Sequence, residues 1–246
     1  SEELGAADLT RFMNRYFAPL TDAIITHDGT VDKYIGDAIL AFWNAPLDIE
    51  HHELQAARSA LAMREAVARL NKERIVDQKV HISFGIGLHS GTCVVGNMGS
   101  DLRFDYSILG DPVNVTSRLE SASKLFSIDI LATDRISKAT PQLAWLDLGF
   151  IRIIGRNDSE HIYALVGDEK MALSNFYRDW QNKHDYMMSL YRNYEFLKAA
   201  SSALEISGQV ETSWQPLYIE FSNRFLFLAE HSCSEENGPL WMPLVK

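Results

Sequence analysis

The chain has 246 residues, of which 46% are hydrophobic and 23% are charged, and its formal net charge is -10. This composition is that of a globular protein with an ample core, arranged as one large domain or as one domain with a smaller appendage. The acidic balance argues against a nucleic-acid-binding surface, because such a surface needs clustered lysines and arginines. It still allows one phosphate-bearing ligand, which needs only a few local cations or a divalent metal.

The sequence has no run of about 18 apolar residues, so it predicts no membrane span. Its first residues lack the pattern of a signal peptide. Cys93 and Cys233 belong to no metal-ligand pattern. One disulfide between them is compatible with the sequence, but we expect two idle thiols in a reducing compartment, and hence a cytoplasmic catalytic domain.

The first elements in chain order are a helix, a hairpin and a second helix. Apolar residues recur at steps of three and four over Leu9–Ile24, which predicts an amphipathic helix. Two β-rich runs, Thr30–Ile35 and Ala38–Trp43, are separated by Gly36-Asp37, which predicts a tight hairpin. Residues 49–70, rich in Ala, Glu and Arg, favour a long helix.

Strands and a short helix follow. Residues 81–88 alternate with period two and predict a strand, and residues 93–95 predict a short one. We expect a polar loop over residues 96–105 and a strand over residues 106–109. Gly110-Asp111-Pro112 then predicts the start of a helix that runs to about Ser123.

The remainder of the chain divides into strands and then helices. Further strands are predicted at residues 128–132, 150–154 and 161–165. The mixture of hairpins, strands and helices indicates the α+β or mixed α/β class. Beyond Gly167 only helical patterns follow, so we expect one domain over residues 1–167 and a separate helical C-terminal extension over residues 168–246. The extension is amphipathic and aromatic, which is typical of a packing surface.

Three polar residues are candidates for chemistry. Asp37 lies at the predicted hairpin turn, where Asp beside Gly is ordinary turn chemistry or a carboxylate that reaches a hard divalent cation. Asn114 and Arg118 stand four residues apart and share one face of the predicted helix. That face is a solvated polar surface or a place to hold a ribose and stabilise charge on a phosphate.

Four segments considered together resemble the class III adenylate and guanylate cyclases, in the order and at about the spacing of that family. The resemblance covers roughly residues 1–167. The segments are Gly29–Trp43, Gly85–Gly91, Val94–Ser100 and Asp105–Glu120.

The resemblance implies a ferredoxin-like sheet domain with helices on the sheet, paired head to tail as a homodimer with two active sites at the interface. Asp37 matches the second of two metal-binding aspartates. Lys33 and Ser107 match the two purine-selecting positions, and Asn114 and Arg118 match the residues that orient the ribose and stabilise the transition state. Asp37 would serve one site, and the other four residues would serve the site across the interface.

The implied reaction converts ATP to 3′,5′-cyclic AMP and pyrophosphate with two Mg²⁺ or Mn²⁺ ions per site. Lys33 only donates hydrogen bonds and Ser107 can accept them, so the pair suits the N1 acceptor and the amino donor of adenine. Guanine presents the opposite polarity, and family guanylate cyclases typically carry an acidic residue in place of Lys33. Many family adenylate cyclases have Asp or Thr where this chain has Ser107.

Two departures from the family pattern support an alternative function. The first metal aspartate of the family precedes the first helix, so its position falls before Ser1. Either the sequence is a fragment, or residues are omitted from it, or the aspartate is truly absent. The position of a family phosphate-binding lysine is held by Ile154, although Arg152 or Arg156 could substitute. The alternatives are therefore a catalytically degenerate, nucleotide-binding or regulatory cyclase fold, and a guanylate cyclase. An upstream sensor or membrane module would fit the family.

Overall fold

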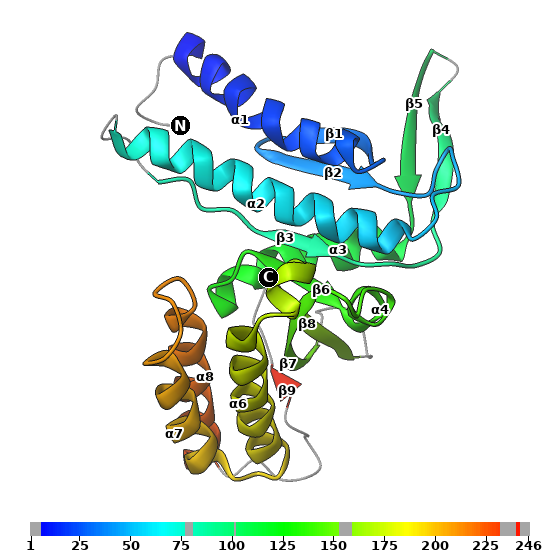
Figure 1. Cartoon of the computed structure of the whole chain (residues 1–246). Helices are drawn as coiled ribbons and strands as arrows, with labels where there is room; N and C mark the ends of the chain where they lie inside the picture. The colour runs from blue at the N-terminus through cyan, green and yellow to red at the C-terminus, as the bar shows by residue number, and fades with distance from the viewer. Residues whose placement is uncertain (1–5, 77–80, 101, 153–158, 232–239, 242–246) are drawn as a thin grey trace. The chain divides into compact units, whose positions relative to one another are not determined.

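The computed structural model forms two compact units, each described here by itself. The N-terminal unit comprises residues 1–84 and 91–113, and the C-terminal unit comprises residues 85–90 and 114–246. Figure 1 shows the whole chain coloured from the N-terminus to the C-terminus. The structure describes residues 6–76, 81–100, 102–152, 159–231 and 240–241.

The N-terminal unit consists of two long helices and two antiparallel hairpins. Its core lies where the first helix packs on the second, with Leu20 of one helix and Ala66 and Val67 of the other all buried. These apolar positions recur at helical spacing, which is why both segments fold as helices with one buried face. The elements are α1 (Ala6–Thr26), β1 (Thr30–Ile35), β2 (Ala38–Phe42), α2 (His52–Val76), β4 (Val94–Ser100) and β5 (Arg103–Leu109).

The hairpin predicted around Gly36-Asp37 is confirmed. Strand β1 pairs antiparallel with β2, and Ile35 pairs with Ala38, so the turn has only two residues between the strands. Gly36 has a φ of 62°, in the left-handed region where a two-residue hairpin turn needs a permissive residue.

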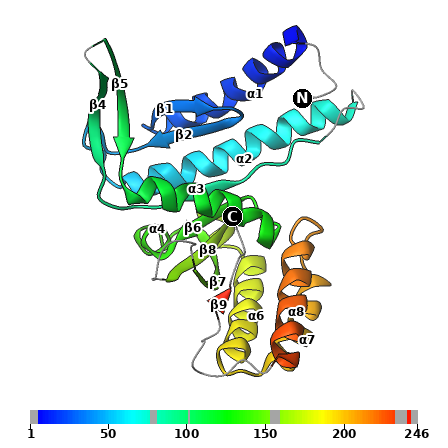
Figure 2. The same ribbon diagram turned by 180° about the vertical axis from the view of Figure 1, so that it is seen from behind.

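The polar loop predicted over residues 96–105 is wrong. Strands β4 and β5 pair over seven positions, from Val94 opposite Leu109 to Ser100 opposite Arg103, and they run side by side as a two-stranded arm in Figures 1 and 2. Most side chains of the arm are exposed on both of its faces. A strand that buries neither face shows no alternation of apolar and polar residues, so its sequence reads as a loop.

The strand predicted over residues 81–88 is much shorter in the structure, where β3 spans only Ile86–Leu88. In the segment before β3, the side chain of Asn71 makes the hydrogen bonds that a neighbouring strand would otherwise make to Ile82. Its Nδ2 donates to the Ile82 carbonyl oxygen at 2.9 Å, and its Oδ1 accepts from the Ile82 amide at 2.8 Å. The Asn71 side chain therefore satisfies the Ile82 backbone groups that would otherwise pair with a neighbouring strand.

The C-terminal unit is built on a five-stranded sheet in the order β3-β6-β8-β7-β9. Pairing is antiparallel between β6 and β8 and between β7 and β8, and parallel at the two outer pairs. The α+β class is thereby confirmed, with the strands of the chain divided over three sheets. The remaining elements are α3 (Asp111–Ser123), the 3₁₀ helix η1 (Lys124–Phe126), β6 (Ile130–Thr133), α4 (Asp134–Ala139), β7 (Ala144–Arg152), β8 (Ser159–Gly167), α5 (Glu169–Ala172), α6 (Asn175–Arg192), α7 (Phe196–Ser207), α8 (Gln215–Glu230) and β9 (Leu240–Trp241).

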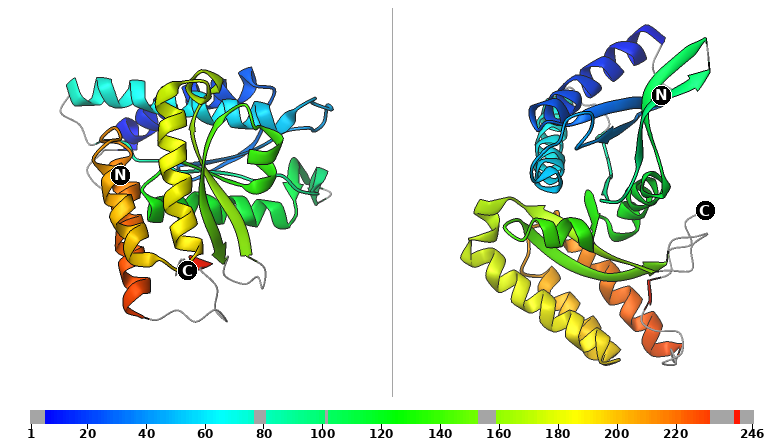
Figure 3. Two further views of the ribbon diagram at one scale, coloured as in Figure 1. Left: turned by 60° about the horizontal axis from the view of Figure 1, so that its bottom comes forward. Right: turned by 90° about the vertical axis from the view of Figure 1, so that its right-hand side faces the viewer.

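The helices predicted beyond Gly167 are confirmed, and they share one hydrophobic core with the sheet. Leu146 of β7 and Ile162 of β8 belong to the same buried cluster as Phe221 and Phe225 of α8. Helix α6 lies across the sheet (Figure 3), and the Tyr177 hydroxyl donates to the Trp145 carbonyl oxygen of β7 at 2.7 Å. The division into two domains at Gly167 stays a prediction.

A buried histidine connects α6, α8 and β7. His184 is fully buried, and its Nε2 lies 2.6 Å from the Asp147 carbonyl oxygen, which can only accept, so Nε2 carries the proton. Nδ1 then accepts from the Tyr218 hydroxyl at 2.9 Å, and that hydroxyl accepts from Trp180 Nε1 at 2.6 Å. Burial lowers the pKa of His184 to about 4, so the histidine stays neutral in the folded protein.

We expect the stability of the C-terminal unit to fall as the pH drops through the range between the two pKa values of His184. Unfolded histidine has a pKa of about 6.5, whereas the folded value is about 4. The unfolded state therefore binds more protons within this range, and His184 alone lowers the free energy of unfolding by about 3 kcal/mol from neutral pH to about pH 4. Urea unfolding at both pH values measures the loss.

The matched control is His184→Gln, whose amide cannot titrate. Groups of the unit that lie away from His184 titrate equally in both proteins, so the difference between the two pH profiles reports the contribution of His184 and its immediate neighbours. Parallel profiles for wild type and variant would contradict the prediction.

Candidate active site

Asp37 lies at the tip of the β1–β2 hairpin, and its side chain is exposed to solvent. Carboxylate oxygen is the ligand that Mg²⁺ and similar hard cations prefer, so the residue fits the role of one metal ligand. The described part of the chain contains no cluster of three or more His, Cys, Asp or Glu side chains that could hold a metal ion. Asp37 can thus supply one of the ligands that a metal-assisted reaction needs.

Lys33 of β1 and Ser107 of β5 meet, although 74 residues separate them in the sequence. Lys33 Nζ donates a hydrogen bond to Ser107 Oγ at 3.1 Å. Ser107 is 5% exposed, whereas the Lys33 side chain is 46% exposed, so the ammonium group lies on the solvent side of the hydroxyl. The structure therefore brings together the two residues matched to the purine-selecting positions.

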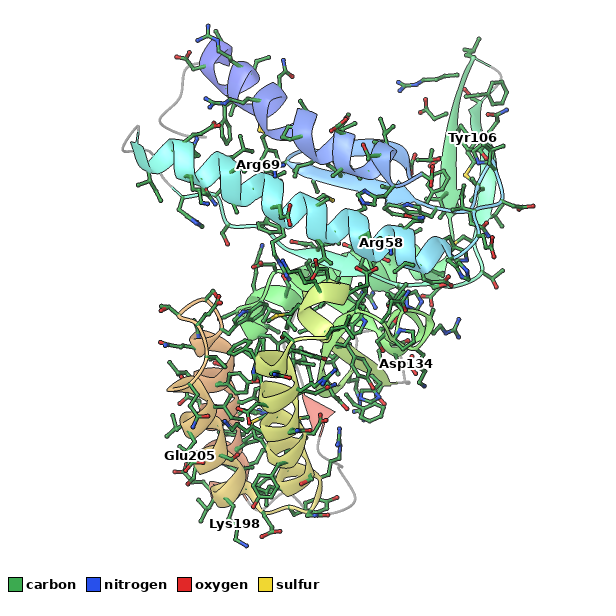
Figure 4. All side chains as sticks on the ribbon, in the orientation of Figure 1. Arg58, Arg69, Tyr106, Asp134, Lys198 and Glu205 are labelled. Atoms are coloured by element: carbon green, nitrogen blue, oxygen red, sulfur yellow. The ribbon has the colours of Figure 1, made fainter. Side chains whose placement is uncertain are left out.

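The contact depends on how β5 is held against the first hairpin. Tyr106, the neighbour of Ser107, faces Phe42 of β2 with 6.2 Å between the ring centroids. Figure 4 labels Tyr106 on the β4–β5 arm. This aromatic pair packs β5 against the first hairpin, which carries Lys33.

Asp32 is a member of this cluster that the sequence did not reveal. Its side chain is 1% exposed and its Oδ1 lies 3.7 Å from Lys33 Nζ, while its Oδ2 accepts a hydrogen bond from Ser107 Oγ at 3.0 Å. An aspartate in a short polar run is typical of a solvent-facing strand position, and that is why its sequence context gave no signal. The adjacent Lys33, which the family resemblance did single out, was the nearest clue.

Asn114 and Arg118 belong to α3 in the C-terminal unit, whereas Lys33, Asp37 and Ser107 belong to the N-terminal unit. Both α3 side chains are exposed, on the side of the helix that adjoins the fully buried Val115 and Leu119. The prediction that Asn114 and Arg118 share one face of a helix is confirmed.

Two glycines, Gly87 in β3 and Gly85 just before it, lie against α3. A Cβ atom on Gly87 would lie 2.2 Å from the Thr116 carbonyl oxygen, and one on Gly85 would lie 2.3 Å from Ser123 Oγ. At Gly87 the neighbouring atom is helix backbone, which cannot move aside as a side chain can, so α3 approaches the strand this closely because Gly87 lacks a Cβ. The exposed face of α3 is thereby held on a rigid support.

The other residues that the sequence analysis considered do not join the cluster formed by Lys33, Ser107 and Asp32. Ile154 and Arg156 lie outside the described residues, and Arg152 is the exposed last residue of β7. Cys93 is a free thiol, and burial raises its pKa, so it stays protonated. Cys233 also lies outside the described residues. Among the helices that the structure describes, none has the length and apolar character needed to cross a bilayer.

The same segments connect the chain to known proteins. Residues 1–167 match the family described as Adenylate and Guanylate cyclase catalytic domain. Adenylate cyclase 1 of Rhizobium meliloti is 32% identical over 168 residues, which cover 68% of this chain and 25% of that protein. The chain thus spans about a quarter of the length of this curated relative.

Two solved structures share the fold. The adenylyl cyclase CyaB from P. aeruginosa is similar with a TM-score of 0.60 at 30% identity, over 68% of this chain and 86% of that one. The guanylyl cyclase Cya2 has a TM-score of 0.61 at 28% identity, over 68% and 84% of the two chains. The family match, the shared fold and the residues placed above lead to one conclusion: the chain belongs to the class III adenylate and guanylate cyclase catalytic domains.

Proposed function

We propose that the chain is the catalytic part of an adenylate cyclase, which converts ATP to 3′,5′-cyclic AMP and pyrophosphate. The observation that carries this choice of substrate is the hydrogen bond from Lys33 Nζ to Ser107 Oγ. The pair offers a donor and an acceptor side by side, which complements the ring N1 and the exocyclic amino group of adenine. The name of the relative from Rhizobium meliloti agrees with this substrate.

The chain's own residues account for the chemistry as follows. The 3′-hydroxyl of the ribose loses its proton to the solvent, and its oxygen bonds to the α-phosphorus. The bond between the α-phosphorus and the bridging oxygen breaks, and that oxygen leaves with the pyrophosphate. Asn114 orients the ribose, and Arg118 neutralises the charge that builds on the phosphoryl oxygens. Two divalent cations, with Asp37 among their ligands, would supply Lewis-acid stabilisation of the attacking and leaving oxygens when bound.

We infer that two copies of the chain form the active site. The described part of the β4–β5 arm exposes large apolar side chains, among them Val94, Leu102 and Phe104. An apolar group of this kind on one hairpin is typical of a protein interface. In such a homodimer Asp37 of one copy serves the site to which the other copy contributes Asn114 and Arg118.

Guanylate cyclase is the second candidate, because one of the similar structures is the guanylyl cyclase Cya2. Guanine presents a donor at N1 and an acceptor at O6, the reverse of adenine. Lys33 cannot accept a hydrogen bond from N1–H, so this candidate requires a different arrangement of the base. A fold that binds nucleotide without turnover is the third candidate, and it predicts no product from either nucleotide.

The test is product formation by the natural full-length chain from ATP or GTP with Mn²⁺ or Mg²⁺. We expect cyclic AMP as the main product. Lys33→Met should lower kcat/KM for ATP by about 10- to 100-fold, because it removes a charged donor to the base. Its effect on the slower GTP reaction should be smaller.

The matched control is Lys72→Met, which changes an exposed lysine on α2 in the same way. We expect this variant to match the wild type. Cyclic GMP as the main product would select the guanylate cyclase, and no cyclic nucleotide from either substrate would contradict both enzymatic candidates.

A further inference from the structure

We propose that Asp32 is a specificity-determining residue, which holds the Ser107 proton and thereby makes the hydroxyl an obligate acceptor toward the base. The inference rests on the proposed function of Lys33 and Ser107 and adds a third residue to them. Three observations carry it: the position of Asp32 in the strand, its contacts, and its burial.

The position of Asp32 is a β-bulge. In the β1–β2 ladder Val31 pairs with Ala41 and Lys33 pairs with Leu40, so Asp32 is the extra residue between two consecutive pairs. In a regular strand, neighbouring side chains point to opposite faces. The bulge breaks this alternation, and the side chains of Asp32 and Lys33 both reach Ser107.

The contacts fix the direction of each hydrogen bond. Lys33 can only donate, so the 3.1 Å contact places one of its protons on a lone pair of Ser107 Oγ. A carboxylate can only accept, so the 3.0 Å contact uses the single hydroxyl proton of Ser107. One lone pair of Ser107 Oγ remains, and no proton remains. Toward a further partner, this hydroxyl can therefore only accept.

The burial of Asp32 indicates that its carboxylate does more than fill space. The side chain is 1% exposed, and Oδ1 has no hydrogen-bond partner among the described residues, with only the Lys33 ammonium 3.7 Å away. A buried carboxylate with an incompletely satisfied oxygen costs free energy. An apolar side chain would fill the same space at a lower cost, so filling space does not explain the aspartate.

The consequence is discrimination between the purines. A free serine hydroxyl can rotate to accept from the amino group of adenine or to donate to O6 of guanine. With its proton held by Asp32, it can accept from adenine but cannot donate to guanine. The carboxylate gives a serine the acceptor character that an aspartate would have at the same position.

Asp32→Asn should reverse this polarity with little change in volume. The ammonium of Lys33 favours the amide orientation in which the Asn oxygen faces Nζ, and the Asn amino group then donates to Ser107. Both lone pairs of Ser107 are used in that state, and its proton is released toward the base. We expect the ratio of kcat/KM for ATP to that for GTP to fall at least about 10-fold, as GTP turnover rises and ATP turnover drops.

Two backgrounds separate this specificity role from a structural one. In a Ser107→Ala background, which has no hydroxyl, Asp32→Asn should leave the ratio within about 2-fold, because the two residues act as one unit. In a Ser107→Thr background, which keeps a hydroxyl, the fall in the ratio should return. Asp147→Asn is the matched control, since Asp147 is a partly buried carboxylate paired with His161 and Arg192 in the C-terminal unit, and it should not change the ratio.

Several results would overturn the inference. An unchanged ratio in Asp32→Asn, or an equal fall in the Ser107→Ala background, would show that Asp32 does not act through Ser107. Asp32→Ala is the second variant if the asparagine variant does not fold, and failure of both to fold would assign Asp32 a structural role instead. If the wild type forms no cyclic nucleotide, the proposed function fails, while the ratio of the dissociation constants of ATP and GTP still tests the inference in the same variants.

Discussion

Arg118→Ala in the natural full-length chain is expected to lower kcat for ATP by about 10²- to 10³-fold, with a smaller change in KM. The guanidinium would act on charge that appears only in the transition state, so its loss lowers the rate more than the binding of substrate. Arg118 is exposed on α3, and the buried face of that helix carries Val115 and Leu119, so truncation leaves the core intact. Steady-state kinetics and the midpoint of thermal unfolding together measure the effect.

Two further variants control the Arg118 result. Arg69→Ala removes an exposed arginine from α2 (Figure 4), where it forms a surface ion pair with Glu65, and this variant should keep the wild-type kcat. Arg118→Lys keeps the charge without the planar fork of donors and should recover only part of the activity. A kcat for Arg118→Ala within about 3-fold of the wild type would show that this residue does not stabilise the transition state.

Asp37→Ala is expected to lower kcat/KM at least about 10³-fold and to raise the Mn²⁺ concentration needed for half-maximal rate. The hairpin itself should survive, since Gly36 supplies the left-handed turn residue and the Asp37 side chain is exposed. The control is Asp48→Ala, which removes another exposed carboxylate of the same unit. Direct measurement of Mn²⁺ binding by electron paramagnetic resonance gives a readout apart from turnover.

Mixing the two inactive variants tests whether the site is shared. A dimer of one Asp37→Ala copy and one Arg118→Ala copy contains one site with both native residues and one site with neither. An equimolar mixture should therefore recover about a quarter of the wild-type rate. If the mixture stays as inactive as its components, the two residues do not serve the site across an interface.

Local sequence signals predicted those elements whose ends or faces have a simple physical cause. Gly36-Asp37 fixed the first hairpin because a two-residue turn needs a left-handed residue. The helix after Gly110 was predicted by Gly110-Asp111-Pro112, because proline is favoured in the first turn of a helix. The β4–β5 arm was missed because its side chains are exposed on both faces.

The candidate site was predictable only in part. The family resemblance identified Lys33 and Ser107 as candidates. No local pattern links two residues that are 74 positions apart in the sequence, so only the fold shows that they are in contact. Asp32 escaped notice because a bulge depends on the pairing of two strands and leaves no periodic trace in one of them.

The core that the sheet shares with α6 and α8 has a consequence for how the molecule loses its structure. The family match ends at residue 167, yet the side chains that cover β7 and β8 include Tyr177 and Phe221, which lie beyond that point. The part of the chain that matches the family therefore ends before the part that we expect to unfold as one cooperative unit. The sheet and the helices after it are expected to unfold in a single transition. A protein cut at Gly167 would expose to water the apolar side chains of β7 and β8 that these helices cover.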